Sequence, residues 1–369
     1  MTRLARALIA YETEAAARAR LMAHGYAADI AAEIAVYLAQ STDLPGFMDE
    51  IAAALAADGI AAEFVELDAL PAALAALPGP SGALLWNLTD GIRFYRGSVV
   101  PALARLHGVA RYGSPATAQH LCQDKFASLA VAATAGLPCP PTLLLEGTEI
   151  IATLGAAFDG PYFVKPNTLG AKIGIFADSR CATLDEARDR AARLWGRYRD
   201  RAVVQPYVAG DDVRVSFMDT GLEMRAQLGL FRLARDAGSE TGGDFMTMKD
   251  NETLSGARDT TGTRGCFGQA REAAFVPGMT DLRGDPSAPV IVGAALRLVR
   301  LLGLADCFSM DFRIGADGRP VFFEFEVCPA VTIYDFQTYL QGVHGLTLGA
   351  ALAKSFRLAH ARAGGMAEA

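Results

Sequence analysis

Apolar and polar residues alternate along two neighbouring segments near the C-terminal end, "CFSMDFRIG" and "PVFFEFEV", on either side of an Asp317-Gly318 pair. A period of two is typical of strands, and Asp-Gly between such segments predicts a β-hairpin with a two-residue type I′ turn. In that register Ala316 pairs with Arg319. One face of the hairpin is then apolar and carries Phe308, Met310, Phe312, Ile314, Val321, Phe323, Phe325 and Val327.

The polar face of this hairpin carries three carboxylates. In the expected register Asp311 lies directly opposite Glu324, and Glu326 follows two residues along on the same face. Opposed residues have Cβ atoms about 5 Å apart, so like charges there destabilise a sheet unless a cation lies between them. Oxygen-only ligands suit Mg²⁺, with Mn²⁺ as an alternative ion. A solvated polar face, on which Arg313 offsets part of the repulsion, is the alternative to a metal site.

The first third of the chain alternates between segments of helical and strand periodicity. Helices are expected near residues 3–24, 46–57, 71–77 and 98–107, and strands near 34–38, 62–67 and 83–88. Such β-α-β alternation predicts a parallel sheet with helices on both faces. The turn "YGSPA" closes this unit, so the first domain is expected at residues 1–115.

Two further α+β units are expected, at residues 116–205 and 206–369. The second has helices near 116–135 and 183–198 and strands near 142–145, 161–165, 173–176 and 202–205. The third has strands near 213–218 and 223–231, the hairpin, and helices near 289–302 and 344–361. A polar, Gly-rich stretch at 236–268 lacks apolar periodicity, and loops of that length in compact domains are usually functional lids or disordered.

Composition narrows the class of protein. Of the 369 residues 51% are apolar, and the net charge is −7 without a Lys/Arg cluster, which argues against a nucleic-acid partner. The longest apolar run, residues 289–308, carries Arg297 and Arg300 at helical spacing and predicts an amphipathic helix rather than a membrane span. The six cysteines lack metal-ligand spacing and are typical of a reducing cytoplasm. The expected partners are small molecules, and a homodimer is left open.

A lysine at the end of an apolar strand is a candidate anion ligand. Lys165 ends "YFVK", and the turn after it, "NTLGAKIG", offers backbone N–H groups and a second cation, Lys172. Backbone amides and a lysine together form an anion cradle, although this is no Walker motif. An ordinary hairpin with exposed lysines is the alternative. Lys125 lies on a predicted helix with an apolar opposite face and is unremarkable by itself.

An extended connector joins the second and third units. It comprises Gln205, Pro206, Tyr207 and Val208, and a turn with Asp212 follows. Extended connectors leave backbone amides and carbonyls free to pair with the edge of an adenine, and a carboxylate shortly afterwards can hold ribose hydroxyls. A plain interdomain linker is the alternative.

Six segments follow one another along nearly the whole chain: "NLTDG" (87–91), "GSPATAQHLCQDK" (113–125), "AGLPCPP" (135–141), "VKPNTLGAKIGI" (164–175), "VVQPYVAGDD" (203–212) and "MDFRIGADGRPVFFEFEVCPAVT" (310–332). In this order and spacing they resemble the ATP-grasp superfamily and, within it, the D-alanine–D-alanine ligase-like branch. The resemblance implies an ATP-grasp fold of α/β and α+β type. An N-terminal parallel α/β substrate domain would precede two α+β domains that hold ATP between them.

The resemblance also implies roles for particular residues. The positions that match the family's ATP-binding residues are Lys125, Lys165, Gln205, Tyr207, Val208 and Asp212. The positions that match its Mg²⁺ ligands are Asp311, Glu324 and Glu326. The latter are the same three carboxylates that the hairpin register brings together.

Four departures from the branch fall largely in amino-acid-binding positions. Glu326 stands where the branch usually has Asn, and Ser309 stands where it has an Arg two residues before the metal-binding Asp. The segment "AQSTDLPG" replaces the Gly-Gly loop and Glu expected after the first strand. Ile333, Tyr334 and Asp335 replace the hydroxyl pair that would hold a D-alanine carboxylate. These differences argue against D-alanyl-D-alanine as the product.

The expected activity is that of an ATP-dependent, ADP-forming carboxylate–amine ligase that works through an acyl phosphate. Candidate catalytic cations, which would stabilise the tetrahedral oxyanion, are Arg214, Arg232 and Lys249. Lys172 would offset charge on the departing ADP, and Tyr334 and Asp335 are candidate substrate residues. A genuine D-alanine–D-alanine ligase and a non-catalytic nucleotide-binding protein are the alternatives, since fold does not fix function.

Overall fold

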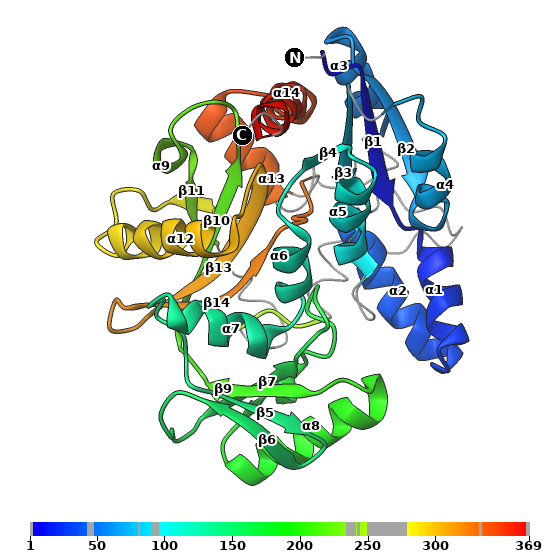
Figure 1. Cartoon of the computed structure of the whole chain (residues 1–369). Coiled ribbons are helices and arrows are strands. Elements are labelled where there is room, and N and C mark those ends of the chain that lie inside the picture. Colours follow the sequence, from blue (N-terminus) through cyan, green and yellow to red (C-terminus); the bar gives the residue numbers. More distant parts are fainter. Residues whose placement is uncertain are drawn as a thin grey trace.

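A computed structural model describes residues 3–42, 48–79, 82–89, 96–233, 241, 244–248, 279–331 and 334–366, with the backbone alone at 36–42, 334–335 and 365–366. Within these residues the chain forms three sheets, each joined to helices (Figure 1). The expected boundary near 115 follows the last strand of the first sheet, and the one at 205 falls at the end of the strand Ala202–Pro206. No helix in the described ranges is both long and apolar enough to cross a membrane.

The N-terminal sheet has four parallel strands in the order β2-β1-β3-β4. They are β1 (Arg6–Tyr11), β2 (Ala61–Glu66), β3 (Ala83–Asn87) and β4 (Ala110–Tyr112). One face packs against α3 (Met48–Ala57) and the C-terminal helix α14 (Leu348–Met366), and the other against α4 (Leu70–Ala75) and α5 (Arg96–Leu106). Helices on both faces bury β3 and all but the ends of β1, as is usual for parallel sheets.

The expected helix over 3–24 and strand over 34–38 are wrong. Residues 6–11 form the central strand β1, and helices α1 (Glu14–Ala23) and α2 (Ala28–Thr42) follow it. Because β1 is buried on both faces, its residues do not alternate between apolar and polar as in a half-exposed strand. Its run of apolar residues is also compatible with an Ala-rich helix. Thr13 caps α1 by accepting a hydrogen bond from the Ala16 N–H at 3.2 Å, which ends the strand and starts the helix.

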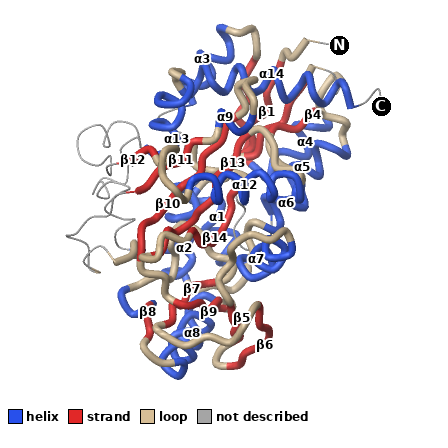
Figure 2. The backbone as a smooth tube through the Cα atoms, turned by 90° about the vertical axis from the view of Figure 1, so that its left-hand side faces the viewer, coloured by secondary structure: helices blue, strands red, loops and turns tan. Residues whose placement is uncertain are grey.

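The central subdomain is an antiparallel sheet in the order β6-β5-β9-β7-β8, covered by α8 (Leu184–Tyr198). Its strands are β5 (Thr142–Glu146), β6 (Glu149–Leu154), β7 (Tyr162–Pro166), β8 (Arg180–Cys181) and β9 (Ala202–Pro206). The strand expected at 173–176 is absent, because Ala171, Lys172 and Gly174 have positive φ and form a turn. In both views this sheet lies at the end of the molecule away from β1 (Figures 1 and 2).

The α1–α2 hairpin reaches across to the C-terminal end of α8. The hydroxyl of Tyr26 donates a hydrogen bond to the carbonyl of Tyr198 at 3.1 Å. Glu33 of α2 accepts hydrogen bonds from the side chains of Arg197 and Tyr198. Apolar residues of α1 and α2 belong to the same buried cluster as α8 and β7, so the N-terminal domain and the central subdomain share a hydrophobic core.

The C-terminal subdomain is an antiparallel sheet in the order β12-β11-β10-β13-β14. Its strands are β10 (Gly210–Met218), β11 (Gly229–Leu233), β12 (Met279–Asp281), β13 (Cys307–Gly315) and β14 (Pro320–Glu326). The remaining helices are α6 (Ala116–Leu121), α7 (Lys125–Thr134), α9 (Met224–Gln227), α12 (Ala288–Leu302) and α13 (Tyr334–Tyr339). The expected helix over 116–135 is therefore two helices, and α6, α7 and α12 pack on this sheet rather than on the central one.

Candidate nucleotide and metal site

The β13–β14 hairpin brings the predicted carboxylates together by a different route from the one expected. Its turn has three residues, because the Gly315 N–H donates to the Arg319 carbonyl at 2.9 Å and Gly318 adopts φ 74°. Ala316 therefore does not pair with Arg319. A bulge after Asp311 shifts the register back by one residue, so that Asp311 lies opposite Glu324 as predicted.

The bulge also changes which aromatic residue faces the site. Phe322 is fully buried in the core of the C-terminal subdomain, whereas the sequence pattern placed Phe323 there. Phe323 lies on the site face, with the Lys165 ammonium 5.3 Å from the centre of its ring. Beyond the bulge Ser309 lies opposite Glu326, which places Glu326 beside the Asp311–Glu324 pair.

Cations surround these carboxylates. Arg214 on β10, opposite Asp311 in the sheet, places Nε 2.6 Å from Asp311 Oδ1. Lys125 at the start of α7 lies 3.6 Å from Glu324 Oε2 and donates a hydrogen bond to the Leu169 carbonyl at 2.8 Å. The site thus joins elements of the central and C-terminal subdomains around opposed acidic groups.

The electrostatics of this cluster keep Glu324 ionised. Burial would raise the pKa of Glu324, but Lys165, Lys125 and Arg214 outweigh it and lower the pKa to about 2. Burial lowers the pKa of Lys165, and Glu324 opposes that change. Burial likewise lowers the pKa of Lys172, and Arg214 adds to this shift. The three lysines and Arg214 therefore act on the same acidic centre.

The carboxylate oxygens at this site are the kind of ligand that a hard divalent cation prefers. Their side chains, however, do not converge on one point in this structure. Among the described residues, no three His, Cys, Asp or Glu side chains converge closely enough to hold a metal ion. Asp311 and Glu324 are instead ion-paired with Arg214 and Lys125. Both offer carboxylate oxygens on one face of the sheet, and that chemistry suits Mg²⁺. Binding an ion would require them to exchange these cations for it.

The Gly-containing turn after β7, which the sequence predicts to be an anion cradle, is held in place by contacts with neighbouring elements. Lys165 is only 6% exposed, and Asn167 ties the turn to α7 by accepting a hydrogen bond from the Phe126 N–H at 2.9 Å. Leu169 and Ile173 are buried in the core shared with α8, which anchors the turn from behind. The turn thereby holds Lys172, whose φ is 63°, beside the acidic centre.

Aromatic side chains lie beside the end of β9 and the connector that follows it. Gln205 shares a sheet face with Phe163 and Lys165, and its amide donates to the Thr142 hydroxyl at 3.0 Å. Its Oε1 is buried and has no hydrogen-bond partner in the described part of the chain. A buried acceptor without a partner is costly, and the amino group of a bound adenine would satisfy it. Val208 is half-buried.

Residues of the connector and of the segment 244–248 cluster together beside β7. Tyr207 lies between the guanidiniums of Arg180 and Arg313, whose carbons are 4.5 and 5.4 Å from its ring centre. The ring of Phe245 contacts Phe163 with centroids 5.0 Å apart. Asp212, the expected ribose ligand, is ion-paired with Arg313 Nε at 2.9 Å. A ribose would therefore compete with Arg313 for this carboxylate.

The structure does not bring all candidate residues to the site. Arg232 pairs with Val213 in the sheet and so lies on the opposite face from Arg214, where it contacts Asp211 and Asp285. The expectation that Arg232 could serve the reacting centre is therefore wrong for this arrangement. Lys249 lies outside the described residues. The side chains of Tyr334 and Asp335 are also not described, although both residues begin α13.

Sequence reasoning missed two aromatic residues at this site. Phe163 precedes Lys165 by two residues on the same strand, so period-two alternation could have placed both on one face. Phe245 lies in a segment without periodicity, and no pattern in the sequence marked it. The first strand was also misplaced: the residue after β1 is Glu12, which is buried and accepts hydrogen bonds from Arg20 at 2.7 and 3.0 Å.

Comparison with known proteins identifies the fold. No protein-family model matches the chain. A D-alanine–D-alanine ligase of Gloeobacter violaceus is 24% identical over 228 residues, 61% of this chain and 65% of that protein. The vancomycin/teicoplanin A-type resistance protein VanA of Enterococcus faecium is 23% identical over 262 residues, 63% of this chain and 71% of that protein. The first alignment thus spans just under two thirds of the relative's length.

Solved structures match over almost the whole chain. A D-alanine–D-alanine ligase from Bacillus anthracis complexed with ATP has a TM-score of 0.64 at 13% identity, covering 98% of this chain and 99% of that one. The chain has the ATP-grasp fold, which it shares with that D-alanine–D-alanine ligase. The fold class expected from the sequence is therefore confirmed. The cluster of carboxylates, lysines and Arg214 lies between the two subdomains that are expected to hold the nucleotide.

Proposed function

We propose that this ATP-grasp protein is an ATP-dependent, ADP-forming ligase that joins a carboxylate to an amine through an acyl phosphate. The observation that carries the proposal is the convergence of opposed carboxylates, three lysines and Arg214 beside a buried, unpaired Gln205 acceptor. The names of the sequence relatives, which are ligases acting on D-alanine or a related resistance protein, support the same reaction class.

In the proposed reaction the γ-phosphoryl group passes from ATP to the substrate carboxylate, giving an acyl phosphate and ADP. Lys125, Lys165 and Lys172 bind the phosphates and offset the charge that develops on ADP. Mg²⁺, held by Asp311, Glu324 and Glu326, would neutralise charge on the β- and γ-phosphates. The amine then attacks the acyl carbon, loses a proton and displaces inorganic phosphate.

Arg214 is the candidate oxyanion ligand for the second step. Its Nη1 lies 3.4 Å from the hydroxyl of Ser309, the position at which D-alanine–D-alanine ligases are expected to carry an Arg. The Arg214 guanidinium on β10 would thus take the place of the Arg side chain that β13 lacks at position 309. A preorganised cation at this point stabilises charge that appears only in the tetrahedral intermediate.

ADP release tests the proposed function. The full-length protein, ATP and Mg²⁺ would be incubated with pools of carboxylates and amines, and ADP and coupled product would be measured together. We expect ADP release to depend on both a carboxylate and an amine. Absence of ADP release with every pool would favour the alternative of a non-catalytic nucleotide-binding protein.

D-alanine alone is expected to give little ADP and little dipeptide. The Arg is displaced from position 309 to Arg214, and Ile333, Tyr334 and Asp335 replace the expected hydroxyls. An acidic residue near a substrate carboxylate is penalised in a closed site. Robust turnover of D-alanine would contradict this prediction and establish the second candidate, a genuine D-alanine–D-alanine ligase.

Lys165→Ala is expected to weaken ATP binding about 100-fold, or ~3 kcal/mol, the scale of truncating one partner of a buried charge contact. Lys165 is buried and faces both Glu324 and the candidate phosphate position. Lys172→Ala should cost less, because Lys172 is half-buried in a turn. Calorimetric titration with a non-hydrolysable ATP analogue measures both. Equal affinities of wild type and Lys165→Ala would remove Lys165 from the phosphate site.

A further inference from the structure

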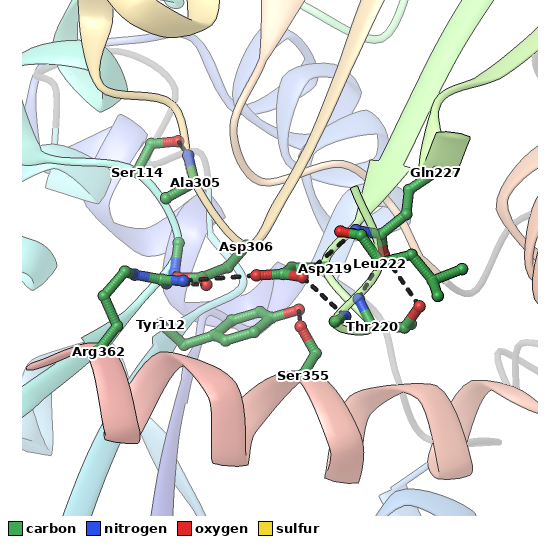
Figure 3. Close-up of polar contacts among 12 residues, drawn as sticks. Tyr112, Ser114, Asp219, Thr220, Leu222, Gln227, Ala305, Asp306, Ser355 and Arg362 are labelled. Carbon is green, nitrogen blue, oxygen red and sulfur yellow. Dashed lines mark hydrogen bonds and ion pairs between the residues drawn. The ribbon is translucent and has the colours of Figure 1, made fainter. Parts of the chain in front are cut away.

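A buried carboxylate lies directly before β13, where the N-terminal domain meets the C-terminal subdomain (Figure 3). Asp306 is 2% exposed, and one of its oxygens accepts a hydrogen bond from Arg362 of α14. The other oxygen accepts one from the Gly113 N–H at 2.8 Å. A buried carboxylate is costly unless it is paired and hydrogen-bonded, so both contacts stabilise this junction.

The same guanidinium reaches a second carboxylate. Arg362 Nη1 lies 3.4 Å from Asp219 Oδ2, and Asp219 directly follows β10. The Asp219 N–H donates a hydrogen bond to the Asp306 carbonyl at 2.7 Å. Arg362 therefore bridges two acidic residues at the adjoining ends of β10 and β13, as Figure 3 shows.

The contacts on the other side of Asp306 belong to the N-terminal domain. Gly113 and Ser114 directly follow β4, at the carboxyl edge of the parallel sheet, and Ser114 accepts a hydrogen bond from the Ala305 N–H at 3.2 Å. The Tyr112 hydroxyl donates to Ser355 of α14 at 3.1 Å. Ligands of open α/β sheets bind outside this carboxyl edge. Helix α14 thus joins a substrate-binding edge to the strand that carries Asp311.

We propose that Arg362 is a positioning residue for the ligase reaction. By pairing with Asp306 and Asp219 it fixes the carboxyl edge of the N-terminal sheet relative to β10 and β13. Those strands carry Arg214 and Asp311, the groups assigned to the reacting centre. The inference rests on the proposed function for its kinetic consequences, but the placement of the two domains can be measured without turnover.

Arg362 acts at a distance from the reacting atoms. Arg214 and Asp311 lie five residues along their strands from Asp219 and Asp306, a span of about 16 Å at the rise of a strand. The lysines that would bind ATP come from α7, β7 and the turn after it, none of which contacts Arg362 in the described residues. Loss of the contacts that Arg362 makes with Asp306 and Asp219 should therefore disturb substrate placement and leave nucleotide affinity unchanged.

Arg362→Met in the full-length protein tests the inference. We expect the affinity for an ATP analogue to stay within about twofold of wild type, a change of ~0.4 kcal/mol. The rate of ADP release with carboxylate and amine should fall about tenfold, or ~1.4 kcal/mol in the barrier, with a raised KM for the carboxylate. Hydrogen exchange of the peptide 112–116 should accelerate, because the Gly113 N–H loses a fixed acceptor.

Arg357→Met is the matched control. Arg357 lies on the same helix but pairs with Asp58, which follows α3, so it contacts neither Asp306 nor Asp219. It should leave both ADP release and exchange of 112–116 at wild-type values. Arg362→Lys, which keeps the charge, should recover part of the lost rate.

The double variant Asp306→Asn/Arg362→Met separates positioning from stability. Asn suits the φ of 62° at this position and carries no buried charge, so the double variant should regain thermal stability. Its rate should remain low if Arg362 positions the domains, and a fully restored rate would overturn the inference. Wild-type rate and exchange in Arg362→Met would also overturn it. If wild type shows no ligase activity but exchange accelerates only in Arg362→Met, the proposed function fails and the positioning role stands.

Discussion

Replacing Glu324 with Gln is expected to lower Mg²⁺-dependent ATP turnover about 1,000-fold, the upper end of the range for loss of one group that stabilises developing charge. The change is isosteric and removes one ionised oxygen donor opposite Asp311. Because the pKa of Glu324 is lowered to about 2, its side chain is charged at every pH at which the assay would be run. Steady-state ADP release measures the loss, and Mn²⁺ paramagnetic resonance in the presence of an ATP analogue measures metal binding.

The fold should survive Glu324→Gln, because the variant relieves repulsion with Asp311 while losing a contact with Lys125 at 3.6 Å. The control is Asp317→Asn, an equal loss of charge in the exposed turn of the same hairpin, which should leave turnover unchanged. Full turnover in Glu324→Gln would show that this polar face is merely solvated and that no metal acts there.

Arg214→Met is expected to lower kcat for ligation by about 100- to 1,000-fold, the effect of removing one oxyanion donor. The guanidinium lies within 2.6 Å of Asp311 and reaches toward Ser309. ATP affinity should change less than kcat, because the guanidinium is assigned to the second step. Comparing kcat with the affinity for an ATP analogue separates the two effects.

Arg232→Met distinguishes the two arginines that the sequence offered. Arg232 lies on the other face of the sheet and contacts Asp211 and Asp285 there, so its loss should lower stability while kcat stays within about twofold of wild type. A large fall of kcat in Arg232→Met, with Arg214→Met near wild type, would reverse the assignment.

The hairpin shows how far sequence patterns reach. The pairing of Asp311 with Glu324 was predicted correctly, although the turn was assigned one residue too few and the bulge was missed. The error in the turn and the missed bulge compensate each other from Asp311 onward. Between the bulge and the turn they do not, so Phe323 was expected in the core, where Phe322 lies instead. A one-residue shift moves a side chain to the other face of a sheet, so register is the weakest part of such an inference.

The cations of the site were predictable as residues but not as an arrangement. Lys165 was recognisable at the end of an apolar strand, because strand periodicity is local in the sequence. The separation of Arg214 from Arg232 depends on which residues pair across β10 and β11, and no local pattern encodes that. The partner that Asp212 takes in the absence of nucleotide, Arg313, likewise depends on tertiary packing.

The docking of the α1–α2 hairpin on α8 closes a ring of contacts among the three parts of the chain. The N-terminal domain touches the central subdomain through Tyr26 and Tyr198, and the C-terminal subdomain through α14. The central and C-terminal subdomains meet in turn where Lys165 of β7 approaches the ring of Phe323 on β14. Because each of the three parts contacts the other two, the central subdomain cannot move away from the others by bending at residues 205–208 alone. Opening the proposed nucleotide site by moving the central subdomain would also strain the Tyr26–Tyr198 contact, so we expect nucleotide entry to depend on that remote contact.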